Sequence, residues 1–197
     1  MSTITKGEIF RKLIHLSNLA IPIGYLFFIP SKTHILLILG CLSVLFITVD
    51  FFRTKSSWLE NIFKILFNFM LRSYELKGRF TGATWVVTGA FVTVAIFPKE
   101  IAILALLFMG LGDTVAGLIG SHFGRIKIWN KTLEGTLAGL AICFLITGFF
   151  PGISIWIRIS GAVSAMLAEL SPIPLDDNIL IPMISGTIMV VISTLVT

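Results

Sequence analysis

The sequence predicts an all-α membrane protein, with about seven transmembrane helices and one amphipathic helix at the membrane surface. Three observations predict this class. Hydrophobic residues make up 56% of the 197 residues, and the mean hydropathy is +0.99. Charged residues make up 13%, against roughly 25% in a typical soluble domain. Several apolar runs approach the length of about 20 residues that a hydrocarbon core requires. Because so many spans leave no room for a second domain, we treat residues 1–197 as one membrane-embedded domain.

Seven apolar runs are candidate transmembrane helices. In lipid, each must satisfy its backbone hydrogen bonds internally, and a helix does so. Prolines at 30, 98, 151 and 172 mark turns between several of the runs. The third run, Thr81–Phe97, is short. The runs are Leu13–Ile29, Ile35–Phe52, Thr81–Phe97, Ile101–Ser121, Thr132–Phe150, Ile153–Leu170 and Ile179–Val196.

The segment between the second and third runs has a different pattern. Ser57 and Glu60 have the spacing of a capping box, which predicts a helix start at about Trp58. Polar residues then recur at helical spacing opposite an apolar face, which is typical of an amphipathic helix lying in the membrane interface. These polar residues are Asn61, Lys64, Asn68 and Arg72. A short eighth span is the alternative.

The distribution of lysine and arginine predicts the orientation. With seven spans, twelve of these residues fall in loops on the side of the N-terminus, and Lys32 and Lys99 fall on the other side. Because cytosolic loops carry the excess of basic residues, we expect a cytosolic N-terminus and a C-terminus on the outside. The formal net charge of +5 is therefore read as loop charge, and no nucleic-acid partner is expected.

Ionisable residues near the span ends indicate a functional site. A charged group within a membrane costs roughly 2.5–3.5 kcal/mol on insertion scales, so each one needs a reason. In the predicted topology, six carboxylates lie toward the cytosolic side, as do Arg11, Lys12 and His15, so that five separate stretches place ionisable groups at one level. We infer a site facing the cytosol at this depth. The six residues are Asp50, Asp113, Glu134, Glu169, Asp176 and Asp177.

The most informative stretch surrounds Asp113. Glycines at 110, 112, 117, 120 and 124 would let a phosphate or another helix approach the backbone closely. The following loop supplies Arg125, Lys127 and Lys131 just before the next helix begins, and a helix N-terminus beside basic residues suits phosphate binding. For the glycines alone, a packing seam of small residues is an equally good interpretation, with Gly135 and Gly139 in the same role.

Two further stretches allow both a functional and a structural interpretation. Asp176, Asp177 and Asn178 offer the oxygen ligands that Mg²⁺ prefers, but Asp177 or Asn178 could instead cap the last helix. Near the N-terminus, Arg11 and Lys12 precede His15 by about one helical turn. They could bind phosphate, or they could be a basic flank that reaches lipid headgroups.

The ordered set of motifs resembles the dolichol kinase, phytol kinase and CTP-dependent diacylglycerol kinase family. The resemblance covers about residues 8 to 185. It rests on Glu8 with Arg11-Lys12-x-x-His15, Gly112-Asp113-Thr-x-Ala-x-x-x-Gly120-x-x-x-Gly124, Lys131-Thr-x-Glu134-Gly-Thr-x-Ala-Gly139 and Asp176-Asp-Asn-x-x-x-Pro182.

The resemblance implies an all-helical membrane enzyme that transfers a phosphoryl group from a nucleoside triphosphate, typically CTP, to the hydroxyl of a membrane lipid. It also implies that Arg11, Lys12, Asp113 and Gly120 are essential. The chain is similar to a short, minimal member, which leaves an isoprenoid alcohol and diacylglycerol both open as the acceptor. A weaker similarity to phosphatidate cytidylyltransferases makes that activity the second candidate. A lipid transporter without enzymatic activity is the third.

These observations give each candidate residue an expected role. Catalytic proton transfer is expected from Asp113, Glu134 or His15. Nucleotide and phosphate binding is expected from Arg11, Lys12, Gly112, Thr114, Gly117, Gly120, Arg125 and Lys131. Magnesium, the expected cofactor, would be held by Asp113 together with Asp176, Asp177 and Asn178. CTP is the expected co-substrate, and the lipid hydroxyl is expected at the cytosolic rim.

Overall fold

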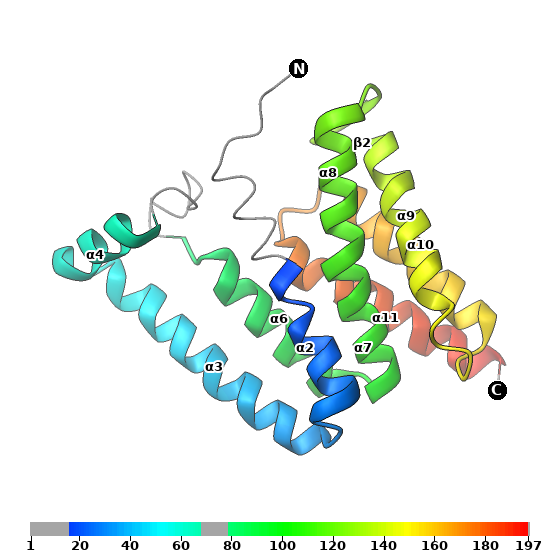
Figure 1. The fold of residues 1–197 in the computed structure, drawn as a ribbon, viewed down its shortest axis with the longest axis horizontal. Coiled ribbons are helices and arrows are strands. Elements are labelled where there is room, and N and C mark those ends of the chain that lie inside the picture. The colour runs from blue at the N-terminus through cyan, green and yellow to red at the C-terminus, as the bar shows by residue number, and fades with distance from the viewer. Residues whose placement is uncertain (1–15, 68–78, 197) are drawn as a thin grey trace.

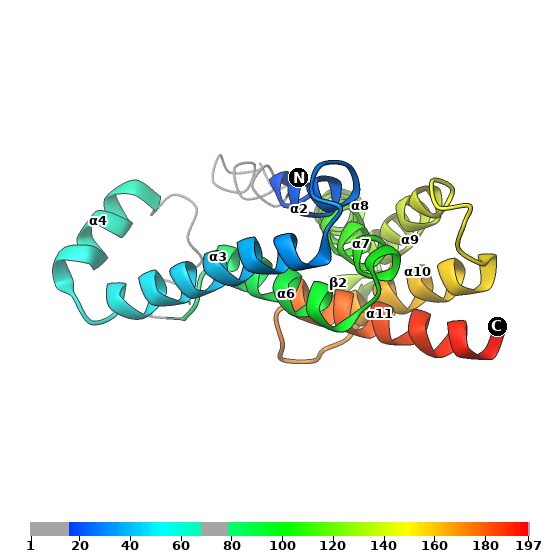
Figure 2. The same ribbon diagram turned by 90° about the horizontal axis from the view of Figure 1, so that it is seen from below.

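A computed structural model describes residues 16–67 and 79–196 of the chain (Figures 1 and 2). The described part is predominantly helical, as the sequence predicts. The N-terminal half holds α2 Ala20–Ile23, the π-helical segment η1 Gly24–Phe28, α3 Lys32–Arg53, α4 Ser57–Phe67 and α6 Gly82–Ile96. The C-terminal half holds α7 Lys99–Leu107, the π-helical segment η2 Phe108–Gly112, α8 Asp113–Phe123, β1 Lys127–Ile128, β2 Lys131–Thr132, α9 Leu133–Thr147, α10 Ile155–Leu170 and α11 Asp177–Val196.

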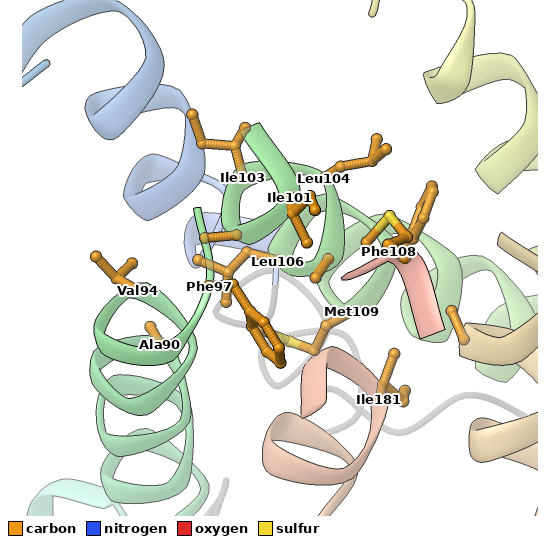
Figure 3. Close-up of a cluster of buried hydrophobic side chains, with 14 of the residues drawn as sticks. Ala90, Val94, Phe97, Ile101, Ile103, Leu104, Leu106, Phe108, Met109 and Ile181 are labelled. Atoms are coloured by element: carbon orange, nitrogen blue, oxygen red, sulfur yellow. The ribbon is translucent and has the colours of Figure 1, made fainter. Parts of the chain in front are cut away.

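A continuous helical rod formed by α7, η2 and α8 is the centre of the bundle. It runs from Lys99 to Phe123, and every residue from Ile101 to Leu106 is buried. Side chains from α6 and α11, including Val94 and Ile181, surround it in the hydrophobic core (Figure 3). The π-helical turn η2 ends immediately before Asp113. Such turns within α-helices are frequent at functional sites because they re-aim the residues that follow.

The other helices pack in pairs around this rod. Helix α9 packs along α8, α10 lies between α9 and α11, and α6 lies between α3 and α11 (Figures 1 and 2). A two-stranded antiparallel hairpin, β1–β2, joins α8 to α9, with Lys127 opposite Thr132 and Ile128 opposite Lys131. This hairpin brings Lys131 back toward the end of the bundle at which α10 ends and α11 begins.

The length criterion supports part of the predicted topology. Three described helices are long and apolar enough to cross a membrane, namely Lys32–Arg53, Lys99–Phe123 and Asp177–Val196. Helices α6 and α9 are apolar but have 15 residues each, and α10 has 16. The predicted span Leu13–Ile29 lies partly outside the described residues. Seven transmembrane helices therefore remains a prediction.

A helix, α4, is present where the sequence predicts the interfacial helix; its position at the membrane surface stays a prediction. It begins at Ser57, one residue before the predicted start, which is within the usual uncertainty of a helix boundary. Trp58 and Ile65 are exposed on it. The predicted positions Asn68 and Arg72 lie outside the described residues.

Asp50 belongs to a separate polar cluster, in which hydrogen bonds link the end of α3 to the start of α6. Its buried carboxylate accepts hydrogen bonds from the Thr81 backbone N–H at 2.7 Å, the Thr84 hydroxyl at 2.6 Å and Arg53 Nε at 2.7 Å. Thr81 directly precedes α6, so this carboxylate caps the N-terminus of that helix. Asp50 therefore has a structural explanation that needs no ligand.

Candidate functional site

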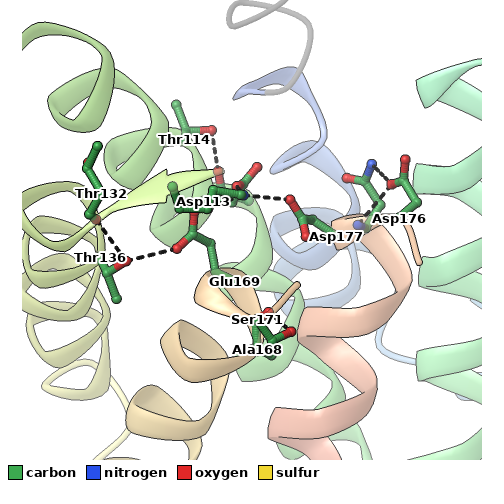
Figure 4. A network of polar contacts seen from close by, with 12 residues as sticks. Asp113, Thr114, Thr132, Thr136, Ala168, Glu169, Ser171, Asp176 and Asp177 are labelled. Carbon is green, nitrogen blue, oxygen red and sulfur yellow. Dashed lines mark hydrogen bonds and ion pairs between the residues drawn. The ribbon is translucent and has the colours of Figure 1, made fainter. Parts of the chain in front are cut away.

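One lysine and three carboxylates meet at the end of the bundle to which the β1–β2 hairpin returns. Lys131 Nζ lies 2.8 Å from Asp177 Oδ2, 2.9 Å from Glu169 Oε1 and 3.7 Å from Asp113 Oδ1. Figure 4 shows the three carboxylates pointing toward one another from α8, α10 and α11. The predicted convergence of Asp113, Lys131 and the 176–178 segment is thus confirmed by these distances.

Three members of the cluster stand at the ends of elements. Glu169 lies in the last turn of α10, Asp177 is the first residue of α11, and Lys131 begins β2. Asp113 instead lies within the continuous rod, at the junction of η2 and α8. Four segments thus place side chains at one point.

The carboxylates of the cluster act on the ionisation of Lys131. Burial by itself would lower the pKa of Lys131, but the charges of Asp113, Asp177 and Glu169 overcome this effect and raise it. Lys131 is therefore an ammonium ion at neutral pH. Among the described residues of the cluster, one positive charge faces three carboxylates.

The three carboxylates differ in how accessible they are. The Glu169 side chain is 2% exposed, whereas Asp113 and Asp177 are 21% and 33% exposed. The Lys131 side chain itself is 30% exposed. A ligand from the aqueous side can therefore reach Asp113, Asp177 and Lys131, while Glu169 lies beneath them.

Within residues 176–178, one carboxylate caps the last helix and the other belongs to the cluster. Asp176 Oδ1 accepts hydrogen bonds from the Asn178 backbone N–H at 3.1 Å and from Asn178 Nδ2 at 2.6 Å. This is the geometry of a helix cap, so the capping residue is Asp176, whereas the sequence pointed to Asp177 or Asn178. Capping by Asp176 leaves Asp177 directed at Lys131.

The glycines around Asp113 lie in a close helix–helix seam. A Cβ atom on Gly120 would lie 2.6 Å from Thr132 Oγ1, and one on Gly135 would lie 2.5 Å from the Ala116 carbonyl oxygen. A Cβ on Gly112 would meet the sulfur of Cys143 at 2.7 Å. The structure thus gives Gly112 and Gly120 a packing role, and Gly117 is half-buried on the same helix.

Other candidate residues lie apart from Lys131 or are engaged elsewhere. The Thr114 hydroxyl is buried and donates to the Gly110 carbonyl at 2.6 Å. Both carboxylate oxygens of Glu134 accept from the Ile126 backbone N–H, at 3.1 and 3.2 Å, which holds the base of the hairpin. Arg125 is exposed on that hairpin. Arg11, Lys12 and His15 lie outside the described residues.

The donor set of the cluster fits a hard divalent cation. Asp113 and Asp177 present carboxylate oxygens from two helices to the accessible side, and Mg²⁺ prefers such oxygens while retaining waters. As the side chains are placed here, no group of three His, Cys, Asp or Glu residues in the described ranges forms a metal-binding cluster by itself. The ammonium of Lys131 lies between the carboxylates instead.

Two further polar residues, Glu169 and Thr136, contribute to the cluster; Glu169 was predicted among the six carboxylates on the cytosolic side, but without a specific role. Thr136 Oγ1 lies 3.2 Å from Glu169 Oε2, so both oxygens of this buried carboxylate have partners. The signal for Glu169 was its position at the end of an apolar span, where an ionisable residue needs a reason. Thr136 is the second threonine of the motif Lys131-Thr-x-Glu134-Gly-Thr-x-Ala-Gly139, but the motif by itself gave it no role.

The described residues therefore form a predominantly helical membrane protein with a polar site at one end of its bundle. It is 27% identical to CTP-dependent diacylglycerol kinase 1 of Saccharomyces cerevisiae over 94% of the chain and 73% of the relative. It is 26% identical to the protein of the same name from Schizosaccharomyces pombe, over 95% and 94%. Dolichol kinase of Saccharomyces cerevisiae is 36% identical over 90 residues, which are 40% of the chain and 17% of that protein.

These similarities support the resemblance that the motifs indicated. Over most of its length the chain is similar to CTP-dependent diacylglycerol kinases, and over a shorter stretch to dolichol kinase. No protein-family model matches the chain. No solved structure matches it either.

Proposed function

We propose that this protein is a lipid kinase that transfers the γ-phosphoryl group of CTP to the hydroxyl of an isoprenoid alcohol or diacylglycerol. The relatives named as kinases support phosphoryl transfer to a lipid. The observation that carries the proposal is the Lys131 ammonium among Asp113, Glu169 and Asp177, at an end of the bundle where polar and apolar substrates can meet.

The chemistry needs positioning and charge stabilisation more than covalent catalysis. The lipid hydroxyl oxygen attacks the γ-phosphorus, the bond to the β-phosphate oxygen breaks, and a nucleoside diphosphate leaves. Lys131 stabilises the negative charge on the phosphate oxygens, and its partial exposure lets them reach it. The Asp113 carboxylate accepts the proton of the hydroxyl. Glu134 and His15 are the other candidate bases.

Magnesium is the proposed cofactor, with Asp113 and Asp177 as the residues that would hold it. When bound, it would neutralise phosphate charge that one lysine cannot balance. Arg11, Lys12 and Arg125 are proposed as further phosphate-binding residues. The lipid tail would remain in the bilayer, and its hydroxyl would reach the cluster from the membrane side.

A product assay with the purified protein tests the reaction. The protein in lipid nanodiscs is mixed with Mg²⁺, CTP or ATP labelled in the γ-phosphate, and a panel of diacylglycerol, a polyprenol and a shorter isoprenoid alcohol. The proposal expects labelled lipid together with CDP. Pyrophosphate with a cytidylylated lipid would support the cytidylyltransferase activity instead. Absence of nucleotide turnover with every acceptor would favour a lipid transporter.

The variant Asp113→Asn tests the site. It keeps the size of the side chain but removes a charge and the proton acceptor, so we expect a loss of kcat on the order of 100-fold or more. Glu100→Gln, an exposed carboxylate at the start of α7, is the control and should retain wild-type turnover. A folded Asp113→Asn protein with the wild-type rate would remove Asp113 from the proposed chemistry.

A further inference from the structure

The buried carboxylate Glu169 differs from its two neighbours in what it can contact. Its side chain is 2% exposed, and both of its oxygens have partners within the protein. Oε1 lies 2.9 Å from Lys131 Nζ, and Oε2 lies 3.2 Å from the Thr136 hydroxyl. A substrate that approaches from the aqueous side meets Asp113, Asp177 and Lys131 first. Glu169 is thus poorly placed to touch a reacting atom but well placed to hold Lys131.

The need for such a residue follows from the flexibility of lysine. Four rotatable bonds separate its ammonium from the backbone, and fixing them costs up to about 2 kcal/mol of conformational entropy. Lys131 stands in a two-residue strand of a hairpin, not in a long rigid element. The buried Glu169 carboxylate lies on α10, which packs against both α9 and α11. It therefore gives the Lys131 ammonium a partner whose position is fixed by the helix packing.

Thr136 extends this arrangement by one residue. It lies on α9, one turn after the hairpin, and its hydroxyl lies within hydrogen-bonding distance of both the Thr132 carbonyl at 3.1 Å and Glu169 Oε2 at 3.2 Å. Glu169 accepts this bond through Oε2 while Oε1 pairs with Lys131. The contact therefore helps to fix the direction of the carboxylate.

We propose that Glu169, oriented by Thr136, is a positioning residue that fixes the Lys131 ammonium toward the phosphate-binding side of the cluster. This inference rests on the proposed function and adds to it a residue pair that acts on the substrate only through Lys131. Asp113 and Asp177 keep the direct roles proposed above. Loss of Glu169 leaves Lys131 paired with those two carboxylates, so the protein should fold while the ammonium becomes misplaced.

A double-mutant cycle between positions 169 and 131 tests the inference. We expect Glu169→Gln to lower kcat by about 30-fold or more with a small change in KM for CTP, because the misplaced ammonium stabilises the transition state less than the bound substrate. Lys131→Met should have the larger effect. In the Lys131→Met background, Glu169→Gln should change kcat less than threefold, since its target is gone. Multiplicative effects in the double variant would overturn the inference.

A second pair of variants, at Thr136, tests the inference even if Glu169→Gln does not fold. Thr136→Val keeps the shape of the side chain but removes the hydroxyl, and we expect kcat to fall about threefold to tenfold. Thr136→Ser keeps the hydroxyl and should restore the rate to within twofold of the wild type. Equal rates for the Val and Ser variants would contradict the role given to this hydrogen bond.

Binding of CTP is measured by equilibrium dialysis on the same proteins, and we expect Glu169→Gln to bind CTP about as tightly as the wild type. If the wild type is active but the two substitutions lower kcat independently, so that their effects multiply in the double variant, this inference alone is overturned. A wild-type protein that neither binds CTP nor turns it over overturns the proposed function and this inference together.

Discussion

At the scale of single residues, Lys131 differs from a surface lysine in the charges that surround its ammonium. It is held by three carboxylates, two of which lie within 3 Å of its ammonium at 2.8 and 2.9 Å. Lys127, four residues earlier on the same hairpin, is exposed. The hairpin thus carries one lysine within the candidate site and one on the surface. Substitutions at these two positions can therefore be compared directly.

We predict that Lys131→Met lowers kcat by on the order of 100-fold, as expected when a preorganised charge at a developing anion is lost. Lys127→Met should stay within about threefold of the wild type because the side chain is exposed. Initial rates of labelled-lipid formation at saturating CTP measure both variants. Equal losses in the two variants would show that general basic charge on the hairpin, and not the position of Lys131, supports the reaction.

At the scale of elements, the close seam between α8 and α9 sets the position of the site. Gly135 lies against the Ala116 carbonyl and the Gly120 backbone, so the two helices approach more closely than side chains would allow. We predict that Gly135→Ala destabilises the protein by about 1–3 kcal/mol, because its Cβ would meet backbone atoms that cannot move independently.

Gly24→Ala is the control for this substitution. Nothing lies within 4 Å of a Cβ at that helical position among the atoms described, so its stability should be unchanged or slightly higher. Unfolding of both proteins in the same detergent, followed by circular dichroism, gives the comparison. A Gly135→Ala protein as stable as Gly24→Ala would argue against the tight seam.

The Asp50 cluster is the second contact between elements that the structure makes testable. Asp50→Asn would leave Arg53 without its charged partner and would turn an amide N–H₂ toward donors from Thr81 and Thr84. Removing one partner of a buried ion pair typically costs about 3–5 kcal/mol, and we expect a loss of that order. The variant should unfold at lower temperature but, once folded, keep the wild-type KM for CTP. A rise in KM without loss of stability would assign Asp50 to the site.

At the scale of the whole molecule, the two ends of the bundle differ in chemistry. One end holds the acidic cluster around Lys131. At the other, Lys32 Nζ donates to the Phe97 carbonyl at 3.0 Å, and Lys99 Nζ donates to the Pro30 carbonyl at 3.3 Å, so the loops after η1 and α6 hold each other. The two lysines that were predicted outside are thus gathered at one end, in agreement with their predicted common side.

We predict that the Lys131 end faces the cytosol. A cysteine at exposed Asn130 should react with a membrane-impermeant maleimide in inside-out vesicles only, and one at exposed Gly152 in right-side-out vesicles only. The unsubstituted chain, with Cys41 and Cys143, gives the background labelling. The reversed pattern would place the proposed site outside and separate it from cytosolic nucleotide.

The sequence alone was sufficient for the class of protein and for much of the site. Hydropathy placed α3, α7–α8 and α11 because a membrane span is encoded locally, in about 20 consecutive residues. The cost of charge in lipid singled out Asp113, Glu169 and Asp177 before any contact was known, and the basic loop before a helix N-terminus singled out Lys131. These signals are one-dimensional, and each can be read within a single segment.

Only the tertiary structure decided how these residues divide the work. The glycines around Asp113 became a packing seam, Asp176 became the helix cap, and Glu169 and Thr136 gained defined roles, because each role depends on a partner in another element or on a backbone direction that spacing does not encode. A residue pattern specifies which side chains a helix offers and how deep they lie. Which helices stand close enough for those side chains to meet is determined by packing of the whole bundle.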